Sequence, residues 1–244
     1  MAAVHNTPPE SVQRHPAIQR LRSIATRLGA LRQRIVFIGG AVAPLLQTTP
    51  PFKSARVTKD VDAIVATATY GEFHALTDQL RALGFRQNLN SGTHVHRWTT
   101  IDGLLFDLVP AGTHAAASGQ RWDILAIERS VEADLGDNVS VRHADAPSFL
   151  ALKFAAYIDR GRSDPFMSHD LEDIVALVSS RALIANEVAT THAELKAYVT
   201  AECRALCDNP FVDDLVAANL SNCFNEAETV RTTTLRLRAL AEIR

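Results

Sequence analysis

The chain has 244 residues, 47% hydrophobic and 21% charged, and its 25 Lys and Arg against 27 Asp and Glu give a formal net charge of −2. This is an ordinary globular balance, long enough to fold without disulfides or a structural metal, and it argues against a surface coated in basic residues for nonspecific nucleic-acid binding. No stretch reaches the roughly 20 apolar residues that span a bilayer. The three cysteines are an odd number clustered at Cys203, Cys207 and Cys223, which indicates buried thiols in a reducing compartment. We therefore expect a cytoplasmic protein without a membrane partner.

The N-terminal region combines a loose start with a basic helix. Residues 1–14 hold two prolines and no hydrophobic periodicity, which is typical of a loose terminus. Over 15–34, apolar residues recur at three- and four-residue steps and predict an amphipathic helix. Residues 1–34 carry six arginines against one glutamate. Such clustering suits contacts with RNA phosphates, whereas arginines carried for solubility are the alternative. The candidate RNA contacts are Arg20, Arg22, Arg27, Arg32 and Arg34.

Strands and helices then alternate. The β-branched run 35–38 predicts a strand that ends at a glycine pair and precedes a short helix over 41–47. Tandem prolines predict a loop over 48–56. Further strands are predicted over 57–65, 93–100 and 104–109, with an amphipathic helix over 70–83.

From Pro147 onward the pattern is helical almost throughout. One helix starts at Pro147, a polar loop is predicted over 159–167, and another helix begins near Ser168. Further helices are predicted over 187–206, 211–220 and 226–243. We therefore predict an α+β fold, a mixed β-sheet with flanking helices followed by a C-terminal helical region. The predicted parts are a loose terminus 1–14, an α/β core 15–146 and a helical domain 147–244.

Three aspartates are the candidate metal ligands. Asp60 and Asp62 alternate along a predicted strand, so their carboxylates point to the same face. Two unpaired carboxylates held so close repel each other, and a divalent cation such as Mg²⁺ removes the conflict. Asp107 lies within an apolar strand, where a charge is costly unless it is paired or bound to metal. A salt bridge from Asp107 to an arginine such as Arg97 is the alternative.

Gly39 and Gly40 lie at the turn from the first strand into a short helix. Glycine lets the backbone approach an anion closely, and the N–H groups of a helix N-terminus bind phosphate, although a plain turn is the commoner use of such a pair. With the three aspartates, the turn predicts a site for a metal-bound nucleoside triphosphate (NTP). Three acids can bind two metal ions, one on the triphosphate and one on an acceptor hydroxyl.

These motifs resemble the DNA-polymerase-β-like nucleotidyltransferase superfamily, and within it the bacterial AbiEii-type branch and its uncharacterised relatives. The resemblance covers roughly residues 35–180 and rests on seven segments: Phe37-Ile-Gly-Gly-Ala41, Val57-Thr-Lys-Asp-Val-Asp62, Arg97-Trp98, Phe106-Asp-Leu-Val-Pro110, Leu150-Ala-Leu-Lys153, Arg160-Gly161 and Ser168-His-Asp-Leu-Glu-Asp-Ile174. Two features depart from the pattern: nineteen residues separate Gly40 from Asp60, and Ala41 stands where a hydroxyl residue is common.

The resemblance implies a role for each matching residue. Gly39 and Gly40 would hold the triphosphate, and Asp60 and Asp62 would bind Mg²⁺. Asp107 would complete the metal site and assist deprotonation of the acceptor. Lys153 would contact phosphate or ribose, supported by Asp170 or Asp173.

The residues outside the triad also have local explanations. Lys153 falls between apolar neighbours and can extend its ammonium to solvent, and Asp170 lies in the first turn of a helix, where an acid complements the helix dipole. His94 and His96 share a strand face but lack a third ligand, so surface residues are the expected interpretation.

The resulting hypothesis is a Mg²⁺-dependent enzyme that transfers a nucleoside monophosphate (NMP) from an NTP to a hydroxyl acceptor. By resemblance, that acceptor can be an RNA such as tRNA, and the protein can be the toxin of a toxin–antitoxin or phage-defence pair with an antitoxin partner. A noncatalytic nucleotide- or partner-binding module and a metal-dependent phosphohydrolase are the alternatives.

Overall fold

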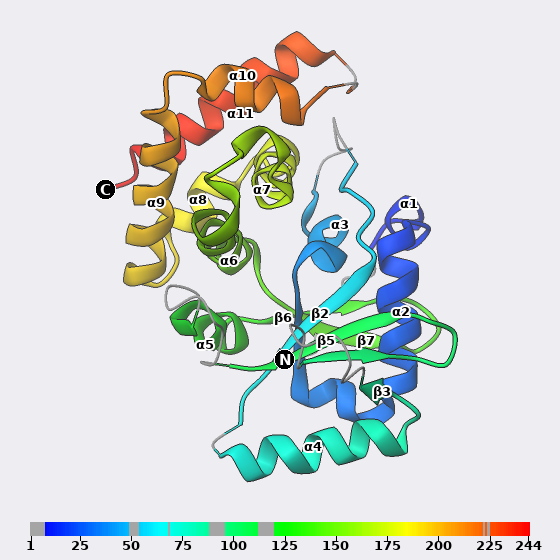
Figure 1. The fold of residues 1–244 in the computed structure, drawn as a ribbon. Helices are drawn as coiled ribbons and strands as arrows, with labels where there is room; N and C mark the ends of the chain where they lie inside the picture. The colour runs from blue at the N-terminus through cyan, green and yellow to red at the C-terminus, as the bar shows by residue number, and fades with distance from the viewer. Residues whose placement is uncertain are drawn as a thin grey trace, which may run out of the picture. The chain divides into compact units, whose positions relative to one another are not determined.

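The computed structural model describes residues 8–48, 54–67, 69–87, 96–111, 120–221, 223 and 225–244. Contacts between Cα atoms divide the chain into two compact units. The first unit comprises Met1–Leu45 and Val57–Ala144, and the second comprises Leu46–Arg56 and Asp145–Arg244. The first unit holds the β-sheet and the second is helical, which confirms the predicted α+β class (Figure 1).

One mixed sheet joins the strands of the described residues in the order β3-β4-β5-β2-β1-β7-β6. β2 runs parallel to β5, and β1 runs parallel to β7; the remaining neighbours are antiparallel. The strands are β1 (Ile35–Ile38), β2 (Asp60–Val65), β3 (Arg86–Gln87), β4 (Arg97–Thr99), β5 (Leu105–Pro110), β6 (Val131–Asp134) and β7 (Ser140–His143).

The core of the first unit forms around β1 and β2. All four residues of β1 are buried, as its continuous apolar run requires of a central strand covered on both faces. In β2, Val61 and Ala63 are buried while the alternating Asp60 and Asp62 are half-buried. Helices α2 (Pro16–Leu28) and α5 (Gln120–Glu128) both pack against β2, and α4 (Tyr70–Ala82) follows β2 in the chain. The apolar face of α2 is buried, as its periodicity predicts.

Several boundaries in the first unit differ from the sequence prediction. The segment predicted as a loose terminus contains a helical turn, α1 (Glu10–Gln13). The predicted helix 15–34 ends at Leu28 because Gly29 adopts φ +55°, and a 3₁₀ helix continues over Gly29–Arg34. The predicted short helix is a 3₁₀ turn at Gly40–Val42 followed by α3 (Ala43–Leu46). The tandem prolines and His94 lie outside the described residues.

The second unit is built from six helices among the described residues. α6 packs against α7 and α9, and α11 packs against α7, α9 and α10. The bounds are α6 (Ala146–Ala156), α7 (His169–Ser180), α8 (Ile184–Ala189), α9 (Ala193–Cys207), α10 (Val212–Asn219) and α11 (Glu226–Ala241). No helix in the described part of the chain is long and apolar enough to cross a membrane.

Helix ends in the second unit follow the predicted signals in part. Asp145 caps α6, with Pro147 in its first turn, and the Ser168 hydroxyl accepts from the Leu171 amide to cap α7. The predicted loop 159–167 starts later, because a π-helical turn over Tyr157–Gly161 extends α6. The predicted helix 187–206 is two helices, α8 and α9.

Candidate metal centre

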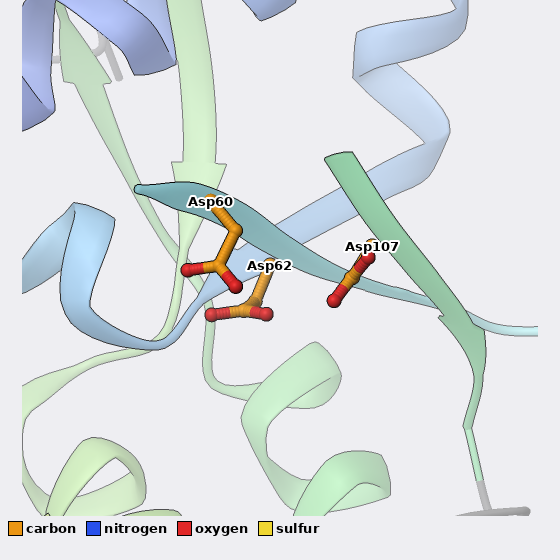
Figure 2. A group of neighbouring side chains, drawn as sticks. All are labelled: Asp60, Asp62 and Asp107. Carbon is orange, nitrogen blue, oxygen red and sulfur yellow. The ribbon is translucent and has the colours of Figure 1, made fainter. Parts of the chain in front are cut away.

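Asp60, Asp62 and Asp107 come together on neighbouring strands. Parallel pairing of β2 with β5 places Asp62 directly opposite Asp107, and Asp60 lies two residues earlier on the same face of β2. One carboxylate oxygen from each residue lies within 4.8 Å of the others (Figure 2). All three residues are half-buried. The predicted carboxylate triad is therefore formed, with oxygen ligands of the kind that Mg²⁺ prefers.

Gly39 makes room for one of these carboxylates. Its φ of +69° lies in the left-handed region, which favours glycine. A Cβ atom at this position would lie 2.2 Å from Oδ2 of Asp62, far inside van der Waals contact. The neighbouring residue Ile38 pairs with Asp62 across β1 and β2, which brings the turn against that side chain. Glycine is therefore required at position 39 to avoid a clash with Asp62, whether or not the turn binds phosphate.

Thr58 contacts Asp60 from outside the triad, and Arg20 in turn contacts Thr58. The Thr58 hydroxyl donates to Oδ1 of Asp60 at 2.7 Å, and Thr58 itself is buried. The Arg20 guanidinium on α2 donates to the Thr58 carbonyl oxygen at 2.7 Å. The role of Thr58 was not predicted. Its position two residues before Asp60, on the same side of an extended chain, was the available signal.

The guanidinium of Arg97 contacts two of the three carboxylates. Nε of Arg97 lies 2.8 Å from Oδ1 of Asp107, and its Nη2 lies 2.6 Å from Oδ2 of Asp107 and 3.0 Å from Oδ2 of Asp60. Antiparallel pairing of β4 with β5 explains the contact, since Arg97 is directly opposite Asp107. The hydrogen bond to Asp107 raises the pKa of Arg97 above its ordinary value; burial opposes this rise, and attraction to Asp107, Asp60 and Asp62 adds to it.

The donor set fits a divalent metal. It consists of hard oxygen ligands close enough for several to contact one ion, and the Arg97 side chain already places a positive charge among them. The side chains of Asp60 and Asp107 are 30% and 19% exposed, so an ion has access from solvent. The salt bridge to Arg97 that the sequence left as an alternative is present as well.

The second unit contains a separate charged cluster around Lys153. Its Nζ lies 3.0 Å from Oδ1 of Asp170 and 2.6 Å from Oδ2 of Asp173, which joins α6 to α7. Arg160 from the π-helical turn donates to both oxygens of Asp170, and Arg56 donates to both oxygens of Asp173. The sequence-predicted trio of Lys153, Asp170 and Asp173 is therefore in direct contact, with two arginines completing it.

The Lys153 cluster is charged despite its burial. Burial favours the neutral amine of Lys153, but attraction to Asp173 and Asp170 outweighs it and raises the pKa of Lys153 above its ordinary value. Burial also disfavours the Asp170 carboxylate, yet Lys153 and Arg160 lower its pKa. Lys153 is only 6% exposed, so its ammonium is held inside the unit and does not extend to solvent. The local explanation offered for Lys153 is wrong for that reason.

Four of the five arginines predicted to contact RNA have partners within the first unit. Arg20 donates to the Thr58 carbonyl, and Arg32 donates to the carbonyls of Ser140 and Gly29. Arg22 and Arg27 pair with Asp137 and Asp102, and the four side chains line one surface pocket. Arg34 is exposed. Arg20 and Arg32 thus have structural roles, whereas Arg22, Arg27 and Arg34 reach the surface.

The remaining candidates have local roles. His96 is half-buried, and its ring meets the edge of Phe73 at 5.9 Å between centroids. All three cysteines are free. Cys203 is buried, and burial raises the pKa of its thiol far above the ordinary value, which makes it unreactive.

Comparison with known proteins finds similarity in structure but none in sequence. No protein-family model matches the sequence, and no curated protein matches it. The crystal structure of an antigenic nucleotidyltransferase-like protein from Paracoccidioides brasiliensis is similar at 16% sequence identity and a TM-score of 0.48. The match covers 83% of this chain and 93% of that chain.

Proposed function

We propose that the protein is a Mg²⁺-dependent nucleotidyltransferase, which transfers an NMP from an NTP to a hydroxyl and releases pyrophosphate. The observation that carries the proposal is the triad of Asp60, Asp62 and Asp107, gathered on β2 and β5 with oxygens within 4.8 Å. Carboxylates gathered in this way are what a metal-bound triphosphate requires.

In this proposal each part of the site has a chemical task. Asp60 and Asp62 would hold the metal, which would supply charge neutralisation of the triphosphate and polarisation of the phosphorus under attack. Asp107 completes the ligand set and assists removal of the acceptor hydroxyl proton. The acceptor oxygen then forms a bond to the α-phosphorus, and the bond to the leaving pyrophosphate oxygen breaks. Catalysis is thus positioning and charge neutralisation.

The nucleotide-binding roles of the other predicted residues stay predictions. Gly39 and Gly40 are predicted to contact the triphosphate through the backbone, although Gly39 is already required by Asp62. Lys153, Asp170 and Asp173 are predicted to contact the nucleotide, yet their charges compensate one another together with Arg56 and Arg160. Of these five side chains Arg160 is the most exposed, at 69%, which makes it the group of the cluster best able to meet a ligand.

The acceptor and biological role are extensions of the same proposal. An RNA acceptor such as tRNA is supported by the arginines of the first unit that reach the surface, Arg22, Arg27 and Arg34. Membership of the AbiEii-type branch, and with it a toxin role and an antitoxin partner, rests on the sequence motifs alone.

A noncatalytic nucleotide- or partner-binding module is the second candidate, and the Arg97 contacts favour it. A guanidinium that neutralises Asp60 and Asp107 removes the repulsion that would otherwise demand a metal. The two candidates differ in whether the bound nucleotide is transferred to an acceptor.

The deciding experiment incubates the protein with each α-³²P-labelled NTP, Mg²⁺ and total RNA, and separates the products on a gel. We expect label to move to an acceptor with wild type and to be lost with D60N/D62N. The matched control is E128Q/E132Q, because Glu128 and Glu132 are two exposed acids of the same unit that lie outside the proposed metal site and RNA surface. Transfer retained in D60N/D62N would refute the enzymatic proposal. NTP binding without transfer to any acceptor would favour the noncatalytic module.

A further inference from the structure

We propose that Arg97 is a resident cation of the carboxylate site, which competes with the divalent metal for Asp60 and Asp107 and pairs with the triphosphate once the metal displaces it. This inference rests on the proposed function, because it assumes that the triad receives a metal and a triphosphate. It adds a residue that controls when the metal enters.

The first argument is that the guanidinium and the metal compete for the oxygens of Asp107, because Arg97 already contacts both of them. Arg97 contacts both oxygens of Asp107 and one oxygen of Asp60. Mg²⁺ requires its ligand oxygens at about 2.0–2.1 Å with near-octahedral geometry. A second cation cannot keep the same oxygens at hydrogen-bond distance without strong repulsion from the ion. Occupation by Arg97 and occupation by metal are therefore mutually exclusive.

The second argument is that Arg97 can leave without unfolding the sheet. Its backbone is fixed opposite Asp107 by the β4–β5 pairing, whereas its contacts with the carboxylates are made only by the long side chain. That side chain is 23% exposed, so it has access to solvent. Lys153 provides the contrast, since its side chain is 8% exposed and lies between two buried carboxylates.

The third argument concerns what the released guanidinium can bind. Arginine presents a planar fork of donors that matches phosphate oxygens as well as carboxylates. A triphosphate that arrives with the metal offers such oxygens next to the same strands. In this exchange Asp60 and Asp107 release the Arg97 guanidinium and bind the metal. Arg97 in turn releases the carboxylates and binds a phosphate group. Metal and triphosphate are consequently expected to bind cooperatively, with each raising the affinity for the other.

The test measures Mn²⁺ binding by electron paramagnetic resonance of the free ion, for wild type, R97Q and R97K, with and without a nonhydrolysable α,β-methylene NTP. We expect R97Q to bind Mn²⁺ alone about tenfold more tightly than wild type, because it removes the competing charge. The NTP analogue is expected to raise the Mn²⁺ affinity of wild type more than that of R97Q, with R97K nearer to wild type. Equal or weaker Mn²⁺ binding by R97Q overturns the inference, as does Mn²⁺ binding by none of the three proteins.

A measurement on the unmodified protein covers the case in which R97Q does not fold. The Nε–H signal of Arg97 is assigned in a ¹⁵N spectrum of arginine side chains by its absence from R97K. Addition of Mg²⁺ with the NTP analogue should shift this signal, whereas a signal that stays unchanged while Mg²⁺ binds contradicts the exchange. If Mn²⁺ binding behaves as expected but no label is transferred to any acceptor, the transferase proposal fails and the role of Arg97 stands.

Discussion

Gly39 is the single residue whose substitution should most directly disturb the triad. The left-handed backbone costs a residue with a Cβ about 1–2 kcal/mol. At Gly39 the added atom would also lie 2.2 Å from the Asp62 carboxylate. G39A should therefore lose stability and displace Asp62, which lowers the Mn²⁺ affinity.

Gly29 provides the matched control, because its φ is +55° and no atom lies within 4 Å of the position that a Cβ would take. G29A should cost only the backbone strain, about 1–2 kcal/mol, and leave Mn²⁺ binding at the wild-type level. Urea denaturation and Mn²⁺ titration of both variants check this. Equal Mn²⁺ affinity in G39A and G29A would show that Asp62 does not depend on the glycine.

Asp170 should make the stability depend on pH in the acid range. Its pKa is lowered in the folded protein from an ordinary value of 3.8. The stabilisation is therefore present above pH 3.8 and is lost as the pH falls through the folded value. D170N should be about 3 kcal/mol less stable than wild type at pH 7, at the low end for a broken buried pair because Arg160 is exposed.

The measurement is urea denaturation of wild type and D170N between pH 7 and pH 3. We expect the difference in free energy of unfolding to be constant down to about pH 4 and to shrink below it, because the unfolded wild type then takes up a proton at Asp170 that the folded protein still resists. D137N should show no comparable difference, since Asp137 is 78% exposed. If the difference in free energy of unfolding between wild type and D170N did not change with pH, Asp170 would not be an ionised carboxylate held by Lys153 and Arg160.

At the scale of elements, the turn that joins α6 to α7 depends on a glycine for space alone. A Cβ on Gly161 would lie 2.4 Å from the Ser168 hydroxyl and 2.7 Å from the Tyr157 ring. Ser168 caps α7, so the steric conflict reaches the helix that carries Asp170 and Asp173. G161A should cost about 2 kcal/mol through overpacking.

Gly71 in α4 is the comparison for that variant. It is also a helical glycine, but the nearest atom to its Cβ position is the Thr69 hydroxyl at 3.9 Å. G71A should raise stability by up to about 0.5 kcal/mol through helix propensity. The urea midpoints of the two variants should move in opposite directions from wild type. A G161A protein as stable as G71A would mean that the π-helical turn relaxes freely.

The elements near the site were predictable because their patterns are local. The apolar run of β1, the alternation in β2 and the charged residue inside β5 are each visible over a few residues, and together they predicted the triad. β6 and β7 were missed because both are short and mix charged with apolar residues, so only their pairing defines them. The break between α8 and α9 was missed because apolar residues recur on both sides of it.

The partners of the site residues were less predictable, because they depend on register and on distant segments. Pairing of Arg97 with Asp107 requires the register between β4 and β5, which no local pattern reveals. The Arg56–Asp173 pair joins residues 117 positions apart. The sequence could therefore name the charged groups, but it could not decide whether they face a metal, a nucleotide or each other.

At the scale of the whole molecule, the net charge of −2 means that any RNA affinity must come from a local group of arginines. Arg22 and Arg27 form partly exposed ion pairs, whose contribution of about 0–1 kcal/mol an RNA phosphate can replace. Arg34 is exposed. Arg20 and Arg32 are engaged by backbone carbonyls and should contribute little.

Three phosphate contacts to a single-stranded RNA predict a slope of about −2 for log K against log salt concentration. Removing two of these contacts in R27Q/R34Q should leave a slope of about −0.7. The control R231Q/R238Q lowers the net charge equally but removes two exposed arginines of α11 in the second unit, so its slope should equal that of wild type. Filter binding between 50 and 200 mM salt measures the slopes. RNA binding that is insensitive to salt would contradict an RNA site on the first unit. RNA affinity that falls equally in both double variants would also contradict it, because a local site requires R27Q/R34Q to lose affinity and R231Q/R238Q to keep it.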